Sequence, residues 1–185
     1  MSENYDPWQN IKTKNGYNAD ELISALQKEI RRGHEENAAA IAHEMATTST
    51  ELENYLWARL RIISVEDIGM ADRYAVLTVH SLDMMRREAT FAHDREMFAI
   101  HAVRYLSSSL KDRSTDELLC WIKKGGILPE IPDYAFDKHT RRGQEMGRSS
   151  EHFMGEASKV APEWEERNKS YRNKLLDLMG LKKEK

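Results

Sequence analysis

The sequence predicts an all-α fold: a bundle of about six helices, antiparallel to their neighbours, followed by an irregular segment and a final helix. Three observations favour this fold class. Apolar residues recur at steps of three and four, which gathers them on one face of a helix. No segment alternates convincingly between apolar and polar residues, as a half-buried strand would. The helical segments follow one another through short connections, which favours antiparallel packing of neighbours.

The first three helices have recognisable ends. Asn18 and Glu21 form a capping box that starts a helix, and Gly33 ends it after two arginines. An alanine-rich helix covers residues 35–47. Thr50 starts the next capping box, and behind it we expect one buried stripe, formed by Leu52, Leu56, Leu60 and Ile63.

Three further helices precede a clear boundary. We expect them at residues 72–87, at 91–110, and from Ser114 to the glycine pair that begins at Gly125. Two prolines follow that glycine pair and cannot continue a helix. Pro162 suits the first position of a last helix. The predicted organisation is an irregular arm at 1–17, a helical domain at 18–126, an extension packed on it at 127–161, and a helix with a frayed tail at 162–185.

Composition narrows the classes of protein that fit. The net charge is −3, so no global basic field favours nucleic acid, and any such binding has to be local. Cys120 is the single cysteine, which excludes an intrachain disulfide, and we expect it buried within the apolar run 118–122. No run is long enough for a membrane span and no secretory leader is visible. We therefore expect a soluble cytoplasmic protein.

The most specific segment is the corner at residues 61–72. An apolar helix that contains Arg61 runs into Glu66 and Asp67, Gly69 closes it, and Asp72 can cap the next helix. Carboxylates near a helix C-terminus oppose the helix dipole unless a cation pairs with them. Arg59, Arg61 or a basic group from elsewhere could supply that cation. The corner fits a structural tie, a catalytic carboxylate pair or a partner-contact site.

These residues resemble the helical C-terminal region of the RarA/MgsA type of clamp-loader-like AAA+ ATPases, which are replication-associated recombination factors. The resemblance covers roughly residues 11–126. Its two most specific elements are Leu-Ile-Ser-Ala, which begins at Leu22, and Glu-Asp-Ile-Gly, which begins at Glu66. The matching pieces follow the family's order and approximate spacing, at residues 12–17, 22–31, 55–72 and 102–106.

The resemblance implies an all-helical, clamp-loader-collar-like domain for oligomerisation and partner contact, linked to replication and repair. A homo-oligomer is expected, with a tetramer as one option, and a separate AAA+ ATPase or replication protein is a candidate partner. No segment matches the phosphate-binding loop G-x-x-x-x-G-K-[ST], so ATP hydrolysis does not carry over to this stand-alone relative. The family's glycine- and tyrosine-rich ending is also missing, and residues 131–148 occupy its place. No cofactor is expected.

A local basic segment at residues 138–148 is the strongest candidate for phosphate contact. Arginine side chains match phosphate oxygens with paired N–H groups, and Gly143 and Gly147 would let a backbone approach closely. The same cations could equally pair with the protein's own carboxylates. The candidate residues for nucleic-acid or phosphate binding are Lys138, His139, Arg141, Arg142 and Arg148.

A third hypothesis starts from the adjacent pair His93 and Asp94, the arrangement of HD-type metal-dependent phosphohydrolases. His80, His101 and Asp112 are the further ligands on offer, but their spacing matches no metal-binding pattern, and no metal site is predicted. We therefore expect a non-enzymatic, self-associating interaction module first, a nucleic-acid-binding accessory protein second, and a phosphohydrolase last.

Overall fold

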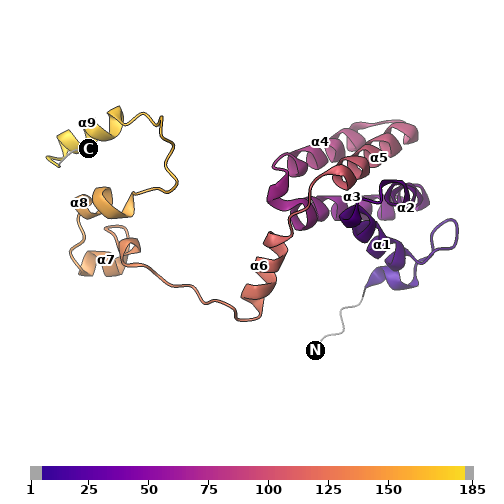
Figure 1. Cartoon of the computed structure of the whole chain (residues 1–185), viewed down its shortest axis with the longest axis horizontal. Helices are drawn as coiled ribbons and strands as arrows, with labels where there is room; N and C mark the ends of the chain where they lie inside the picture. Colours follow the sequence, from indigo (N-terminus) through magenta and orange to yellow (C-terminus); the bar gives the residue numbers. More distant parts are fainter. Residues whose placement is uncertain (1–5, 182–185) are drawn as a thin grey trace. The chain divides into compact units, whose positions relative to one another are not determined.

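The computed structural model describes residues 6–181 and divides into two compact units (Figure 1). The N-terminal unit ends at Ile127 and the C-terminal unit begins at Leu128. The predicted all-α class is confirmed: within residues 6–181 there is no sheet, and strand-like pairing is limited to one isolated bridge between Lys12 and Asn18. Among these described residues, no helix has the length and apolar character needed to cross a membrane.

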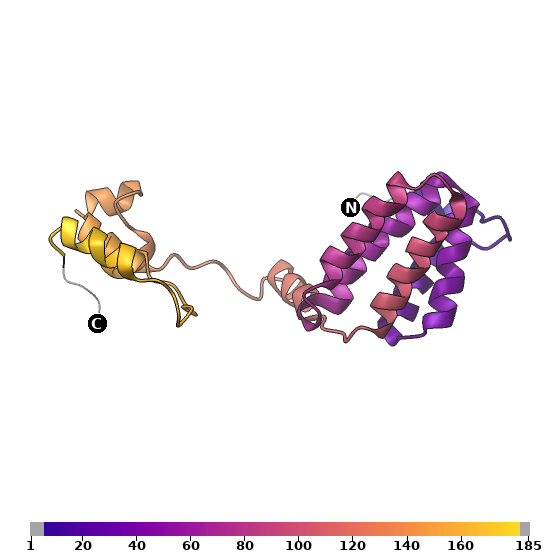
Figure 2. The same cartoon turned by 90° about the horizontal axis from the view of Figure 1, so that it is seen from above.

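The described part of the N-terminal unit, residues 6–127, begins with a 3₁₀ turn, η1 (Pro7–Asn10), and contains six α-helices. Figure 2 shows its longer helices running alongside one another. The helices are α1 (Ala19–Arg32), α2 (Glu35–Thr48), α3 (Thr50–Ile63), α4 (Ala75–Glu88), α5 (Ala92–Ser108) and α6 (Ser114–Lys123). Between α3 and α4 lie a π turn, η2 (Ser64–Ile68), and a 3₁₀ turn, η3 (Gly69–Ala71).

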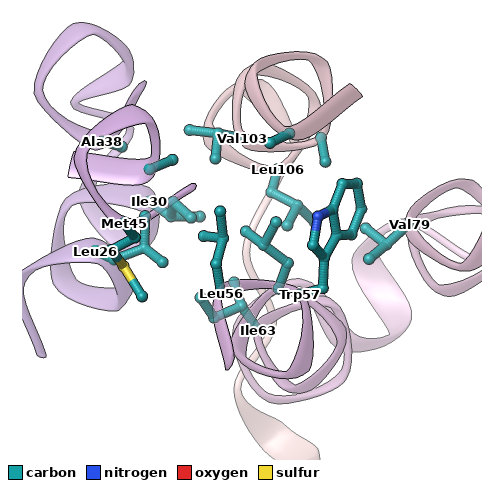
Figure 3. Close-up of a cluster of buried hydrophobic side chains, with 14 of the residues drawn as sticks. Leu26, Ile30, Ala38, Met45, Leu56, Trp57, Ile63, Val79, Val103 and Leu106 are labelled. Carbon is teal, nitrogen blue, oxygen red and sulfur yellow. The ribbon is translucent and has the colours of Figure 1, made fainter. Parts of the chain in front are cut away.

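The core of the N-terminal unit is the cluster of side chains shared by α1 to α5. Figure 3 shows Leu56 and Trp57 of α3 pointing toward Val103 and Leu106 of α5, and all four are completely buried. The stripe predicted on α3 is confirmed, because each of its members is fully buried: Leu52, Leu56, Leu60 and Ile63. Helix α6 contributes no residue to this core.

Two helix starts differ in detail from the predicted capping boxes. Asn18 is the N-cap residue of α1, but its side-chain oxygen accepts a hydrogen bond from Lys12 Nζ at 2.5 Å instead of from the first turn. Helix α3 is capped by Ser49, whose Oγ accepts from the Leu52 N–H at 3.2 Å, one residue before the predicted cap. Gly33 ends α1 in the left-handed conformation, as predicted.

The C-terminal unit consists of short helical pieces joined by irregular backbone. They are η4 (Asp133–Ala135), α7 (Arg141–Glu145), α8 (Ser150–His152), η5 (Phe153–Ala157) and α9 (Ser170–Leu178). The last helix begins at Ser170 and not at Pro162, since a proline tolerated at a helix start is equally at home in extended backbone. That this unit packs on the helical domain stays a prediction. The expected tail at 182–185 and the first five residues of the expected arm lie outside the described residues.

Candidate interaction site on helix α6

Gly69 brings the corner between α3 and α4 against the chain that leads into α6. Its backbone has a φ of 54°, a region that favours glycine. A Cβ atom at this position would lie 2.3 Å from the carbonyl oxygen of Asp112. The positive φ was predicted from the turn. The structure adds a second reason for glycine, which is the close approach of the Asp112 backbone.

The carboxylate of Asp67 is fully buried and lies at the centre of the corner. Its Oδ1 accepts a hydrogen bond from Arg31 Nε at 2.5 Å, and its Oδ2 accepts one from Gln27 Nε2 at 2.9 Å. Arg113 Nε lies 3.4 Å from Oδ1 on another side. The arginines beside Asp67 therefore come from α1 and from the residue that precedes α6, whereas the candidates nearest in the sequence were Arg59 and Arg61.

Glu66 joins the same group of charges. Its Oε1 lies 3.2 Å from Arg31 Nη2 and 3.6 Å from Arg113 Nη2. Arg61 lies instead beside Asp83, with 3.4 Å between Nη1 and Oδ2. Both adjacent carboxylates thus act as ion-pair acceptors that connect α1, the corner and the start of α6.

Asp72 connects the corner to α5 and does not cap α4 directly. Its Oδ1 accepts from the Tyr74 N–H at 2.9 Å, and its Oδ2 accepts from the Tyr105 hydroxyl at 2.6 Å. The hydrogen bond from Tyr105, with help from Tyr74, lowers the pKa of Asp72 below its ordinary value. The carboxylate is therefore charged at neutral pH and stabilises the chain entry into α4.

The N-terminal end of α6 is fixed to the corner through main chain and side chain. The Asp112 N–H donates to the Asp67 carbonyl oxygen at 2.9 Å. The Asp112 carboxylate accepts from the Ser114 N–H at 2.9 Å, and Arg113 Nη2 lies 2.5 Å from the Asp116 carboxylate. The first turn of α6 is consequently positioned by the corner that the sequence singled out.

The C-terminal end of α6 is closed by the glycine pair. Gly125 has a φ of 77° and donates to the Ile122 carbonyl at 3.0 Å, while Gly126 donates to the Trp121 carbonyl at 2.9 Å. This pair of bonds is a Schellman motif. A Cβ on Gly126 would lie 2.1 Å from the indole nitrogen of Trp121, so the backbone packs directly on the ring. The predicted glycine stop is confirmed.

Between these two fixed ends, α6 presents an apolar face to solvent. Within α6, all ten residues of which are described, no side chain is buried. Four large apolar side chains form two adjacent pairs, and the members of one pair lie three or four positions from members of the other, so that all four share one side of the helix. We call them the α6 stripe, and each is between 45% and 54% exposed: Leu118, Leu119, Trp121 and Ile122.

The prediction that Cys120 is buried is wrong. Cys120 is exposed, and its Sγ lies 3.9 Å from the carboxylate of Asp116 one turn earlier. Helical spacing places it on the side of α6 away from the stripe. The apolar run in the sequence is therefore part of an amphipathic helix, with Cys120 on the side opposite the stripe and Asp116 between the two.

The structure gives internal partners to the basic residues that were candidates for phosphate contact. Arg148 Nη2 lies 2.8 and 2.7 Å from the two carboxylate oxygens of Asp133. Arg141 Nε bonds to Glu145 at 2.9 Å, although its side chain is 93% exposed. The guanidinium of Arg142 stacks on the ring of Phe136, 4.1 Å from its centroid.

The remaining two candidates surround Phe153. Lys138 Nζ lies over its ring at 5.3 Å and donates to Ser150 Oγ at 3.0 Å. The ring of His139 meets Phe153 edge-on, with 5.3 Å between the centroids. The predicted basic residues are thus held by carboxylates and aromatic rings of their own unit, and His139, Arg141 and Arg142 are exposed.

The histidine–aspartate pair does not assemble a metal centre. Within residues 6–181, no group of three His, Cys, Asp or Glu side chains has an arrangement that could hold a metal ion. His93 and Asp94 lie in the first turn of α5, and both are exposed. The further ligands that the sequence offered do not join them.

A second buried charge network was missed by sequence reasoning. Asp83 accepts from Arg86 Nε at 2.8 Å and from Arg87 Nη2 at 2.9 Å. The guanidinium of Arg86 also lies 5.6 Å from the ring centroid of Trp57. The spacing of Asp83, Arg86 and Arg87 at three and four positions was the available signal. Glu53 lies 3.6 Å from Arg86 and is paired with Arg95, and both Glu53 and Arg95 line a pocket of about 500 Å³.

Comparison with known proteins does not assign this chain to a family. No protein-family model matches the chain, and no curated protein matches it. The resemblance of residues 11–126 to the C-terminal region of RarA/MgsA-type ATPases therefore stays a prediction. What the geometry establishes is a helical unit with an amphipathic helix that is fixed at both ends and carries four large, half-exposed apolar side chains.

Proposed function

We propose that this chain is a non-enzymatic, self-associating interaction module that works in DNA replication, recombination or repair. One observation carries the self-association: the α6 stripe is exposed although both ends of α6 are fixed. Large apolar side chains that gather on one exposed face are typical of protein interaction sites, because their burial removes apolar surface from water.

The fixed position of both ends of α6 supports this role. A helix that is already ordered loses little conformational freedom when a partner binds, so more of the interaction free energy remains for affinity. The ion pairs from Arg113 and the Schellman turn at Gly125 supply that order before assembly. Trp121 and two leucines are large apolar side chains of the kind that anchor interfaces.

The link to replication and repair has a separate support. It comes from the resemblance of the corner and its flanking helices to the C-terminal region of RarA/MgsA-type ATPases. In this proposal the chain supplies the assembly function of such a region, and a separate AAA+ ATPase or replication protein is its partner. A homo-oligomer, with a tetramer as one option, is the expected assembly.

Sedimentation velocity of the full chain over a range of micromolar concentrations tests the self-association. We expect the average mass to rise with concentration, and Leu118→Glu with Ile122→Glu to return the chain to a monomer. Leu77→Glu is the matched control, because Leu77 of α4 is also exposed. Circular dichroism should show unchanged helix content in all variants. A wild-type chain that stays monomeric throughout the range contradicts the proposal.

A nucleic-acid-binding accessory role is the second candidate, favoured by the outward placement of Arg141 and Arg142. A guanidinium that stacks on Phe136 presents its N–H edge to solvent, where phosphate oxygens can approach. If this role is correct, DNA binding weakens steeply with salt, and Arg141→Ala with Arg142→Ala removes most of it. Lys159→Ala, in the same unit, is the control. Absence of binding at low salt rejects this candidate.

A further inference from the structure

We propose that α6 pairs with α6 of a second copy of this chain in the antiparallel direction, around a two-fold axis near the middle of the helix. The inference rests on the proposed self-association and names its partner and geometry. The occupant of the α6 stripe is thus the same stripe of another copy.

The charges that flank the stripe carry this inference. Asp116 and Glu117 lie in the first turn of α6, and Lys123 with Lys124 lies at its end. Residues seven positions apart lie on nearly the same side of a helix. Glu117 and Lys124 therefore share one edge of the stripe, beside Trp121, and Asp116 and Lys123 share the other edge, beside Leu119.

Antiparallel pairing brings opposite charges together on both edges. When two copies of α6 pack stripe to stripe in opposite directions, each edge meets the same edge of the partner. Glu117 then lies beside Lys124 of the other copy, and Asp116 lies beside Lys123, twice over by symmetry. The positive N-terminal end of each helix dipole also lies beside the negative end of the other.

Parallel pairing would oppose like charges instead. The acidic first turns would meet at one end and the lysines at the other, and like charges in contact weaken association. The sequence of α6 is therefore self-complementary in one direction only. A two-fold interface of this kind uses the same patch on both copies and closes at the dimer.

The size of the stripe predicts a weak pair. Ten helical residues span only about 15 Å, and the contact is smaller than the roughly 800 Å² per partner of a standard stable interface. A dissociation constant in the micromolar range is expected, and added salt should weaken it because the flanking charges are exposed.

A charge reversal along one edge tests the direction of pairing. The variant Glu117→Lys with Lys124→Glu leaves the Arg113–Asp116 contact intact. Two copies of this variant still attract each other in an antiparallel pair, because the residues at positions 117 and 124 have exchanged charges in both copies. Against the wild type, the variant places lysine beside Lys124 and glutamate beside Glu117. The mixed dimer should therefore be about tenfold weaker than either homodimer.

The exposed single cysteine provides the readout. Donor and acceptor dyes on Cys120, on the side of α6 away from the stripe, report mixing of wild type and variant by energy transfer. The matched control is Glu117→Gln with Lys124→Gln, which should mix freely with the wild type. Circular dichroism checks that each variant is folded.

The possible results separate the two proposals. Preferred self-pairing of the reversal variant and poor mixing with the wild type support the antiparallel pair. A reversal variant that pairs with itself more tightly than the wild type does, with mixed dimers of intermediate strength, indicates parallel pairing. Free mixing with equal affinities indicates another surface. Either result overturns this inference and leaves self-association intact. A monomeric reversal variant that is folded also overturns it. A monomeric wild type removes the proposed self-association itself.

Discussion

Asp67 and Arg31 form an ion pair between a fully buried carboxylate and an arginine 36 positions away, with 2.5 Å between Oδ1 and Nε. The same carboxylate lies beside Arg113, directly before α6. One buried negative charge therefore connects the first helix of the bundle to the helix that carries the stripe. The stability of the bundle and the presentation of α6 depend on the same group.

Replacement of that carboxylate should be costly. Asp67→Asn keeps the shape but removes the charge between two guanidinium groups, and we expect a loss of about 3 kcal/mol of unfolding free energy. Urea denaturation followed by circular dichroism measures it. Glu66→Gln is the matched control: its side chain is partly exposed, and its loss should stay below about 1 kcal/mol. Equal losses for both variants would refute the central role of Asp67.

Gly69 should tolerate alanine less well than another glycine with positive φ. Gly16 has a φ of 86° and open space where a Cβ would lie, so Gly16→Ala carries backbone strain of about 1 kcal/mol. Gly69→Ala adds the collision with the Asp112 carbonyl, and we expect about 3 kcal/mol. Thermal and urea unfolding compare the two. Similar costs would show that the corner and the α6 connection can separate freely.

Asp83 should contribute to the acid sensitivity of the fold. Burial raises the pKa of Asp83, but hydrogen bonds from Arg87 and Arg86 outweigh this and lower it below the ordinary 3.8. A lowered folded-state pKa gives stability that is present above the unfolded pKa and is lost as pH falls through the folded value. Asp83→Asn should therefore flatten the decline in stability below pH 3.8. Unfolding free energies measured between neutral pH and pH 2 check this, and parallel curves would contradict it.

Cys120 should react quickly with a thiol reagent in the folded protein. Its side chain is exposed on the side of α6 away from the stripe, so neither the fold nor antiparallel pairing covers it. We expect native and urea-unfolded protein to differ by less than about tenfold in the rate of reaction with a chromogenic disulfide. Strong protection in dilute native protein would show that another element covers α6.

The sequence was most informative where local spacing alone sets the outcome. The buried stripe on α3, from Leu52 to Ile63, follows directly from helical periodicity, which fixes the side of the helix that each residue occupies. The ends of α1 and α6 followed from Gly33 and Gly125, because a positive φ favours glycine. These features need no knowledge of distant parts of the chain.

Features that depend on distant residues could not be read in the same way. The corner was recognised as needing a cation, but nothing local indicates that Arg31 and Arg113 supply it. Cys120 was expected inside, since an apolar run does not reveal whether another element covers it. The basic segment was recognised as charged, whereas the pairing of Arg148 with Asp133 depends on how the chain folds back.

The hydrogen bond from the Asp112 N–H to the Asp67 carbonyl has a consequence for variants of this chain. The start of α6 is fixed to a corner whose buried carboxylate is held by Arg31 of α1. A substitution that loosens the corner is therefore expected to disturb the proposed assembly surface without changing any residue of the stripe. In the proposed assembly, the strength of self-association would thus report on the integrity of the whole bundle.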